Sequence, residues 1–232
     1  QSNCQAKIRS VPQELKLIYS GGFKEIIFSN EDYKCSFDIL LTLVNNYIKA
    51  QTISIDQIKK ILQEEYNKLY NINPNSILNV IHTYSKNNEK ELIKKGVLSL
   101  NDLITNKDYD VNVIDIIIIA NYYKIPIVLI SKNKFNETNS MYMTFNVLDK
   151  AYFIVTPRVY KTSTRASKYG LLFKDNDALI NLSAIQNEPS RVKVEKSNQD
   201  INKILNYYDS LESDKNKSVK KTKKINKKII LT

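Results

Sequence analysis

The feature that most constrains the fold is an apolar block followed, after a short break, by a second one. Residues 114–120 read Ile-Asp-Ile-Ile-Ile-Ile-Ala, and residues 125–130 read Ile-Pro-Ile-Val-Leu-Ile. The first block alone is compatible with a buried helix or a strand. Because the second block makes the better central strand, with Pro126 at its entrance, we predict a buried helix over 109–124 and a strand over 125–130. Neither block approaches the run of about eighteen apolar residues typical of a membrane span, so we expect no membrane partner.

The remaining periodicity predicts helices and short strands around that pair. Ser54 and Gln57 have the spacing of a capping box at the start of a helix. Further helices are expected over 76–84, 89–95, 99–104 and 199–211, and strands over 23–28, 141–147, 151–156, 171–173 and 178–185. The pattern favours an α+β or three-layer α/β fold, with a small central sheet flanked by helices.

Composition argues against several kinds of site. The chain has four glycines, and none stands in a phosphate-binding pattern, so we expect no nucleotide site. Two cysteines and one histidine do not complete a standard zinc set. Asp110 and Asp115 are five residues apart and share no helix face, so we interpret them as a cap and a polar-edge residue. We therefore expect no metal and no cofactor, and the low cysteine content favours a reducing, intracellular compartment.

One cysteine stands where a polar loop turns into an apolar helix. The segment Asp32-Tyr33-Lys34-Cys35-Ser36-Phe37 precedes a run in which Ile39, Leu40, Leu43 and Val44 recur at helical spacing. A thiol in the first turn of a helix has a lowered pKa, because the positive end of the helix dipole stabilises the thiolate. Asp32 is the expected N-cap. The alternative interpretation is that Cys35 is a small buried residue without chemistry.

The order of these elements resembles that of the ovarian-tumour-type (OTU) cysteine proteases, which are deubiquitinases, including their divergent forms in large DNA viruses. The family's nucleophile motif is Asp-Gly-Asn-Cys-x-Phe, and this chain matches it at Asp32, Cys35 and Phe37. The segment from Tyr109 to Ala120 and the strand after it are similar to the family's next landmark. The resemblance covers roughly residues 23–156. It implies that Cys35 and Asp32 are the site residues and that a ubiquitin-like protein is the partner.

The chain departs from the family where the general base should stand. The resemblance places a histidine at the start of a strand, before a tyrosine, whereas this sequence reads Ala151-Tyr152. A thiol that attacks an isopeptide bond needs a base within hydrogen-bond reach. His82 is the only histidine of the chain. It falls on a predicted helix, away from the family position, where a surface or partly buried role without catalysis is the simpler interpretation.

The basic residues concentrate at the end of the sequence. Residues 213–232 contain eight Lys and one Asp, a charge of +7, whereas the preceding 212 residues carry +4. We expect this tail to be disordered and to bind nucleic acid non-specifically. The lysines assigned to that role are Lys220, Lys221, Lys223, Lys224, Lys227 and Lys228. A solvated tail that aids solubility, or a linker, is the alternative.

Three functions follow from these features. The first is a catalytically inactive, OTU-like module that binds a protein or has a structural part in a larger viral protein. The second is an active thiol isopeptidase that uses Cys35, and the third is a structural nucleic-acid-associated protein. We divide the chain into a lead-in (1–22), an OTU-like domain (23–186), a linker with the last helix (187–212) and the tail (213–232). The chain does not begin with Met, so we read it as part of a longer protein, intracellular and in one alternative virion-associated.

Overall fold

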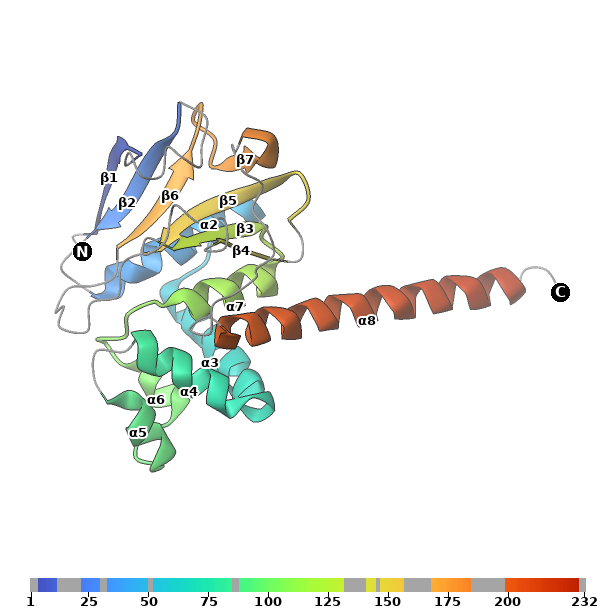
Figure 1. The fold of residues 1–232 in the computed structure, drawn as a ribbon, viewed down its shortest axis with the longest axis horizontal. Helices are drawn as coiled ribbons and strands as arrows, with labels where there is room; N and C mark the ends of the chain where they lie inside the picture. Colours follow the sequence, from blue (N-terminus) through green and yellow to red (C-terminus); the bar gives the residue numbers. More distant parts are fainter. Residues whose placement is uncertain are drawn as a thin grey trace.

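The structure is a computed structural model that describes residues 4–11, 22–29, 33–49, 52–84, 88–131, 141–144, 147–156, 168–184 and 199–229. It is a mixed α+β fold in which a small sheet lies beside a group of helices, and one long helix extends away from them (Figure 1). The coarse expectation of an α+β fold with a small sheet and flanking helices is confirmed.

The strands are β1 (Gln5–Ser10), β2 (Lys24–Ser29), β3 (Ile127–Ser131), β4 (Met141–Met143), β5 (Lys150–Thr156), β6 (Tyr169–Phe173) and β7 (Leu179–Asn181). The helices are α2 (Asp38–Ile48), α3 (Ile55–Ile72), α4 (Pro74–Tyr84), α5 (Glu89–Lys94), α6 (Leu100–Thr105), α7 (Val113–Tyr123) and α8 (Gln199–Ile229). Two short 3-10 turns complete the description, η1 (Tyr33–Phe37) and η3 (Leu182–Ala184).

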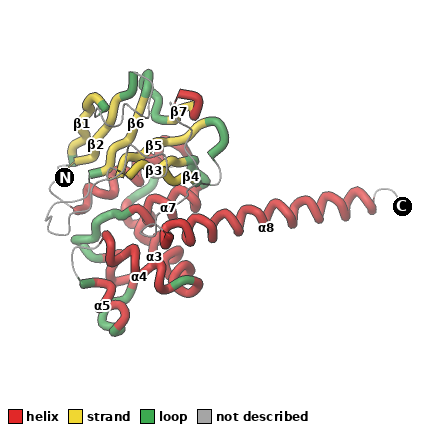
Figure 2. Tube along the Cα trace, in the orientation of Figure 1, coloured by secondary structure: helices red, strands yellow, loops and turns green. Residues whose placement is uncertain are grey.

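The sheet is mixed, with the order β1-β2-β6-β5-β3-β4, and β7 pairs with the start of β5. β3 and β5 are parallel, which requires a crossover, while the other ladders are antiparallel. Helices α2 and α7 contact each other beside the sheet, and α3, α4, α5 and α6 form the group farther from it (Figure 2). The strand predicted over 125–130 is therefore the interior strand β3.

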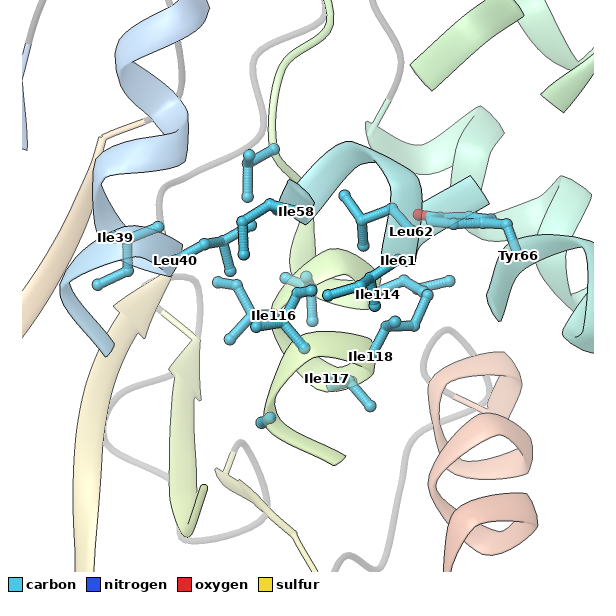
Figure 3. Packing of buried hydrophobic residues seen from close by; sticks show 14 of the residues in the cluster. Ile39, Leu40, Ile58, Ile61, Leu62, Tyr66, Ile114, Ile116, Ile117 and Ile118 are labelled. Carbon is cyan, nitrogen blue, oxygen red and sulfur yellow. The ribbon is translucent and has the colours of Figure 1, made fainter. Parts of the chain in front are cut away.

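The main core is built on α7, which is the buried helix that the apolar block predicted. All residues from Val113 to Asn121 are buried, because α7 lies between the sheet and α3. Figure 3 shows Ile116 of α7 close to Leu40 of α2 and Ile58 of α3. Each fully buried isoleucine stabilises the fold by about 1.5–3 kcal/mol relative to an exposed one. The position of α7 thus fixes the surrounding helices.

Helix boundaries follow local signals at several places. The Ser54 side chain accepts a hydrogen bond from the backbone N–H of Gln57, and the Gln57 side chain accepts one from the backbone N–H of Ser54. The predicted capping box is therefore confirmed. The predicted end of the last helix at residue 211 is wrong, because α8 continues to Ile229 through the segment expected to be disordered. No Gly or Pro interrupts residues 199–229, and Lys is a good helix former. An established helix adds one hydrogen bond for each residue it fixes.

Candidate functional site

The cysteine segment occupies the junction of β2 and α2. η1 leaves the sheet after β2 and leads into α2, and Cys35, Ser36 and Phe37 of this turn are all buried. The Ser36 Oγ accepts a hydrogen bond from the Val111 amide at 2.9 Å. The Phe37 ring lies 6.1 Å from the Tyr109 ring. These contacts attach the turn to the segment that precedes α7.

Cys35 forms a disulfide with Cys4, and their Cα atoms are 5.4 Å apart. Cys4 directly precedes β1, and the antiparallel register pairs Gln5 with Ser29, so Cys4 reaches the end of β2 where η1 follows. Both interpretations of Cys35 from the sequence assumed an unpaired cysteine, and this assumption is wrong. A disulfide sulfur is not a thiolate, and Cys35 is only 1% exposed. Cys35 is thus buried, as the second interpretation expected, but it is bonded to Cys4.

The predicted placement of Cys35 in the first turn of an α-helix is also wrong. α2 begins at Asp38, its N-cap is Phe37, and no side chain caps it. Asp32, the expected N-cap and family-matched residue, lies outside the described residues. The carboxylate of Asp38 stands close to both sulfurs, with the three ligand atoms within 4.8 Å of one another. Burial raises the pKa of Asp38. Because the two sulfurs are bonded to each other, this group is not a set of metal ligands in the oxidised chain.

The start of β5, where the family's general base would stand, lies beside the C-terminal end of α2. The Tyr152 ring, on β5, makes an edge contact with Tyr47 at 6.4 Å between ring centroids. Tyr47 lies near the C-terminal end of α2, whereas Cys35 precedes its N-terminal end. At 1.5 Å per residue these two ends are about 14 Å apart. The start of β5 therefore lies beside the end of α2 that is farther from Cys35, and the packing of Cys35 against this strand stays a prediction.

His82 lies exposed in the last turn of α4. α4 contacts α3, α5 and α8, whereas η1 contacts α2 and β2. Figure 1 shows α4 on the side of α7 that is remote from the sheet. The structure does not bring His82 and Cys35 together as a dyad, and a surface role for His82 agrees with its exposure.

A buried polar cluster, which the sequence did not reveal, surrounds Asp115. The Tyr66 hydroxyl donates to Asp115 Oδ1 at 2.8 Å, and the backbone N–H of Asn112 donates to Asp115 Oδ2 at 2.8 Å. The Tyr109 hydroxyl donates to both oxygens. Asn112 and Asp115 form a capping box at the start of α7, so the assignment of Asp115 to a polar edge is wrong although its capping role follows a known pattern.

Electrostatics at this cluster are set by burial. The Asp115 side chain is 0% exposed, and burial raises its pKa to about 7, although the three donors lower it in part. Burial also raises the pKa of Tyr66 and of Tyr109 well above the ordinary value, so both remain donors. Because solvent does not reach the cluster, its role is to join α3, the 109–112 segment and α7.

A second buried carboxylate lies on β2. Glu25 is 0% exposed, and its Oε2 accepts hydrogen bonds from Arg9 of β1, with Arg9 Nη2 at 2.8 Å and Arg9 Nε at 2.9 Å. The other oxygen, Oε1, has no hydrogen-bond partner. Glu25 lies over Gly170 of β6, where a Cβ would be 1.8 Å from Oε1. Only a glycine at position 170 leaves room for this side chain.

Comparison with known proteins gives no assignment: no protein-family model, curated protein or solved structure matches the chain. Within the part of the chain that the structure describes, no helix is long and apolar enough to cross a membrane.

Proposed function

We propose that this chain is a protein-binding module, similar in element order to the OTU proteases, that does not cleave its partner. One observation carries this proposal: the sulfur of Cys35 is buried and bonded to Cys4. A nucleophile for isopeptide cleavage must be a thiolate that the substrate reaches. The oxidised chain lacks that group at the family-matched position.

The surroundings of Cys35 support the same conclusion. Ala151-Tyr152 stands where the family has its base, and Tyr152 lies beside the far end of α2. General base catalysis contributes about 10²–10⁴-fold to such reactions. Reduction of the disulfide would restore a thiol, but it would not supply an imidazole at that position.

A ubiquitin molecule that carries a thiol-reactive group at its C-terminus tests the absence of catalysis. We expect no covalent adduct with the oxidised chain, and none after reduction with a dithiol. An adduct that forms after reduction, persists in Cys4→Ala and is lost in Cys35→Ala would overturn the proposal. Its further loss in His82→Ala would identify that imidazole as the base.

The partner that the resemblance implies is a ubiquitin-like protein. Calorimetric titration of the full chain with unmodified ubiquitin tests this step separately. We expect saturable binding that is equal in the wild type and in Cys35→Ala, because binding does not use the thiol. Absence of a binding heat would exclude this class of partner while leaving the absence of catalysis standing.

A second candidate function rests on α8. The helix continues to Ile229, and its residue Glu212 forms an ion pair with Lys124 at the C-terminal end of α7. Residues 213–232, with a charge of +7, follow that contact, and Figure 1 shows the helix projecting from the body. A projecting basic segment is suited to bind phosphates without reading bases. On this basis the third function, association with nucleic acid, remains a proposal.

Salt dependence tests this function. If six lysines neutralise phosphates, the slope of log K against log salt on duplex DNA is roughly −5, with little difference between sequences. A chain that ends at Glu212 should lose the binding. The six predicted lysines changed to Gln provide a matched control of full length. Equal DNA affinity of the truncated and full chains at the same salt concentration would exclude the extension as the binding element.

A further inference from the structure

The N-terminal strand β1 has an open edge. It stands at the end of the sheet order, and β2 is its only ladder partner among the described residues. All six of its residues are exposed. In an antiparallel pair, alternate residues direct their N–H and C=O groups to the partner and the others direct theirs away. Half of the β1 residues therefore offer unpaired backbone groups at the outer edge.

Three attachments hold β1 in place although it buries none of its own residues. The Cys4–Cys35 disulfide precedes it, and the buried Val11 follows it. Between them, Arg9 donates to the buried Glu25. An exposed strand is thus fixed at both ends and at Arg9, so its outer edge is ordered before any ligand arrives. This order lowers the entropy cost of adding another strand.

The side chains of β1 alternate in chemistry. Arg9 shares a face of the sheet with Glu25, its register partner, so Gln5, Lys7 and Arg9 lie on one face. Ala6, Ile8 and Ser10 lie on the other face, and Ile8 is 66% exposed. A strand that pairs with this edge meets Lys7 and the Glu25-paired Arg9 on one face, and Ala6, Ile8 and Ser10 on the other.

A second copy of β1 fits this edge poorly. Two-fold antiparallel pairing about Lys7 sets Lys7 opposite Lys7, and pairing about Ile8 sets Lys7 opposite Arg9 of the other copy; pairing about Ala6, which avoids both, shortens the ladder by using only the N-terminal part of β1. Like charges directly opposite each other destabilise a ladder, and lysine on an edge strand opposes self-association. A strand with acidic residues opposite Lys7 and apolar residues opposite Ile8 has neither defect.

We infer that the outer edge of β1 binds an extended segment of another protein, in which acidic residues alternate with apolar ones. The segment joins the sheet as an additional strand. Backbone hydrogen bonds provide the affinity, and the side chains on the two faces of β1 provide the selectivity. The inference does not depend on the OTU resemblance or on the absence of catalysis, since β1 lies outside the 23–156 region of that resemblance.

The probe is a fluorescent eight-residue peptide that alternates Glu with Val, and the comparison peptide carries Lys in place of Glu. Binding to the full oxidised chain is followed by anisotropy at physiological salt. Lys7→Glu should lower the affinity for the acidic peptide by about 3- to 10-fold and raise the affinity for the Lys peptide. Lys150→Glu is the matched control, because Lys150 is an exposed strand lysine that pairs with β7.

Amide hydrogen exchange identifies the surface. In the free chain, alternate amides of β1 should exchange fast, and the acidic peptide should slow those amides while leaving the inward-directed ones unchanged. Equal weakening by Lys7→Glu and Lys150→Glu, or no weakening by either, would overturn the inference. Binding that leaves β1 exchange unchanged would do the same, because the peptide would then occupy another surface. Dimerisation that protects β1 in the absence of peptide would show that the occupant is a second copy.

Discussion

The Tyr109 hydroxyl donates to both carboxylate oxygens of Asp115, at 2.8 and 3.0 Å, in a part of the core that is closed to solvent. Asp115 belongs to the first turn of α7, and Tyr109 precedes that helix. Since α7 is buried from Val113 to Asn121 and the Phe37 ring contacts Tyr109, this pair connects the helix with the disulfide turn. The protonation of Asp115 and the loss of a hydroxyl that donates to it are therefore expected to change the stability of the whole fold.

Stability should depend on pH through Asp115. Burial raises its pKa from 3.8 to about 7. Between about pH 4 and about pH 7, the native state binds more protons than the unfolded state, so the free energy of unfolding falls as pH rises through that window. Urea unfolding across it measures the slope. In Asp115→Asn, this contribution disappears and the slope becomes shallower; equal slopes in the two proteins would show that Asp115 does not titrate there.

Removal of one donor tests the hydrogen-bond cluster. Tyr66→Phe deletes the hydroxyl that donates to Asp115 at 2.8 Å and keeps the buried ring. We expect a loss of about 1–3 kcal/mol in the free energy of unfolding, since a buried acceptor loses a partner. Tyr70→Phe, on the same helix and only partly buried, is the control and should change stability little. Similar losses for both variants would argue against a special role for the cluster.

The disulfide should contribute to stability through the chain that it closes. Cys4 and Cys35 are 31 residues apart, and a loop of that length predicts a stabilisation of about 3–4 kcal/mol in the chain-entropy model. Chemical unfolding of the wild type with and without a reductant measures it. Because the chain has two cysteines, the Cys4→Ser/Cys35→Ser variant is free of thiols, and its free energy of unfolding should be the same with and without the reductant. Unchanged wild-type stability after complete reduction would contradict this account.

Gly170 should tolerate no side chain while Glu25 is present. The Cβ of Gly170→Ala would stand 1.8 Å from Glu25 Oε1, and overpacking of this kind costs about 1–3 kcal/mol. Glu25→Ala removes the obstacle, so Gly170→Ala should cost less in that background. A double-mutant cycle by thermal unfolding gives the coupling. If the stability changes of the two single variants simply add up in the double variant, the cost of Gly170→Ala does not come from contact with Glu25.

Local signals in the sequence predicted much of the secondary structure. The apolar block gave α7 and the strand behind it, because length and apolar content identify a buried helix-strand pair without knowledge of distant partners. Ser54 and Gln57 located the start of α3, since a capping box is complete within four residues. Less of the candidate site could be predicted from the sequence. The position of Cys35 before an apolar helix indicated an unusual cysteine, but its disulfide with Cys4 was not predicted.

The tertiary structure decided what depends on strand pairing and burial. β1 places Cys4 beside η1 only because it pairs antiparallel with β2, and no local pattern in residues 4–11 specifies that register. In the same way, Tyr66 reaches Asp115 across 49 residues of sequence, and Glu25 occupies the space that Gly170 leaves on a neighbouring strand. The sequence by itself thus determined the existence of the apolar helix α7 and the start of α3, because these signals lie within short stretches of neighbouring residues. The disulfide, the open β1 edge and the buried carboxylates arise from contacts between distant segments, which exist only after the sheet and helices have assembled.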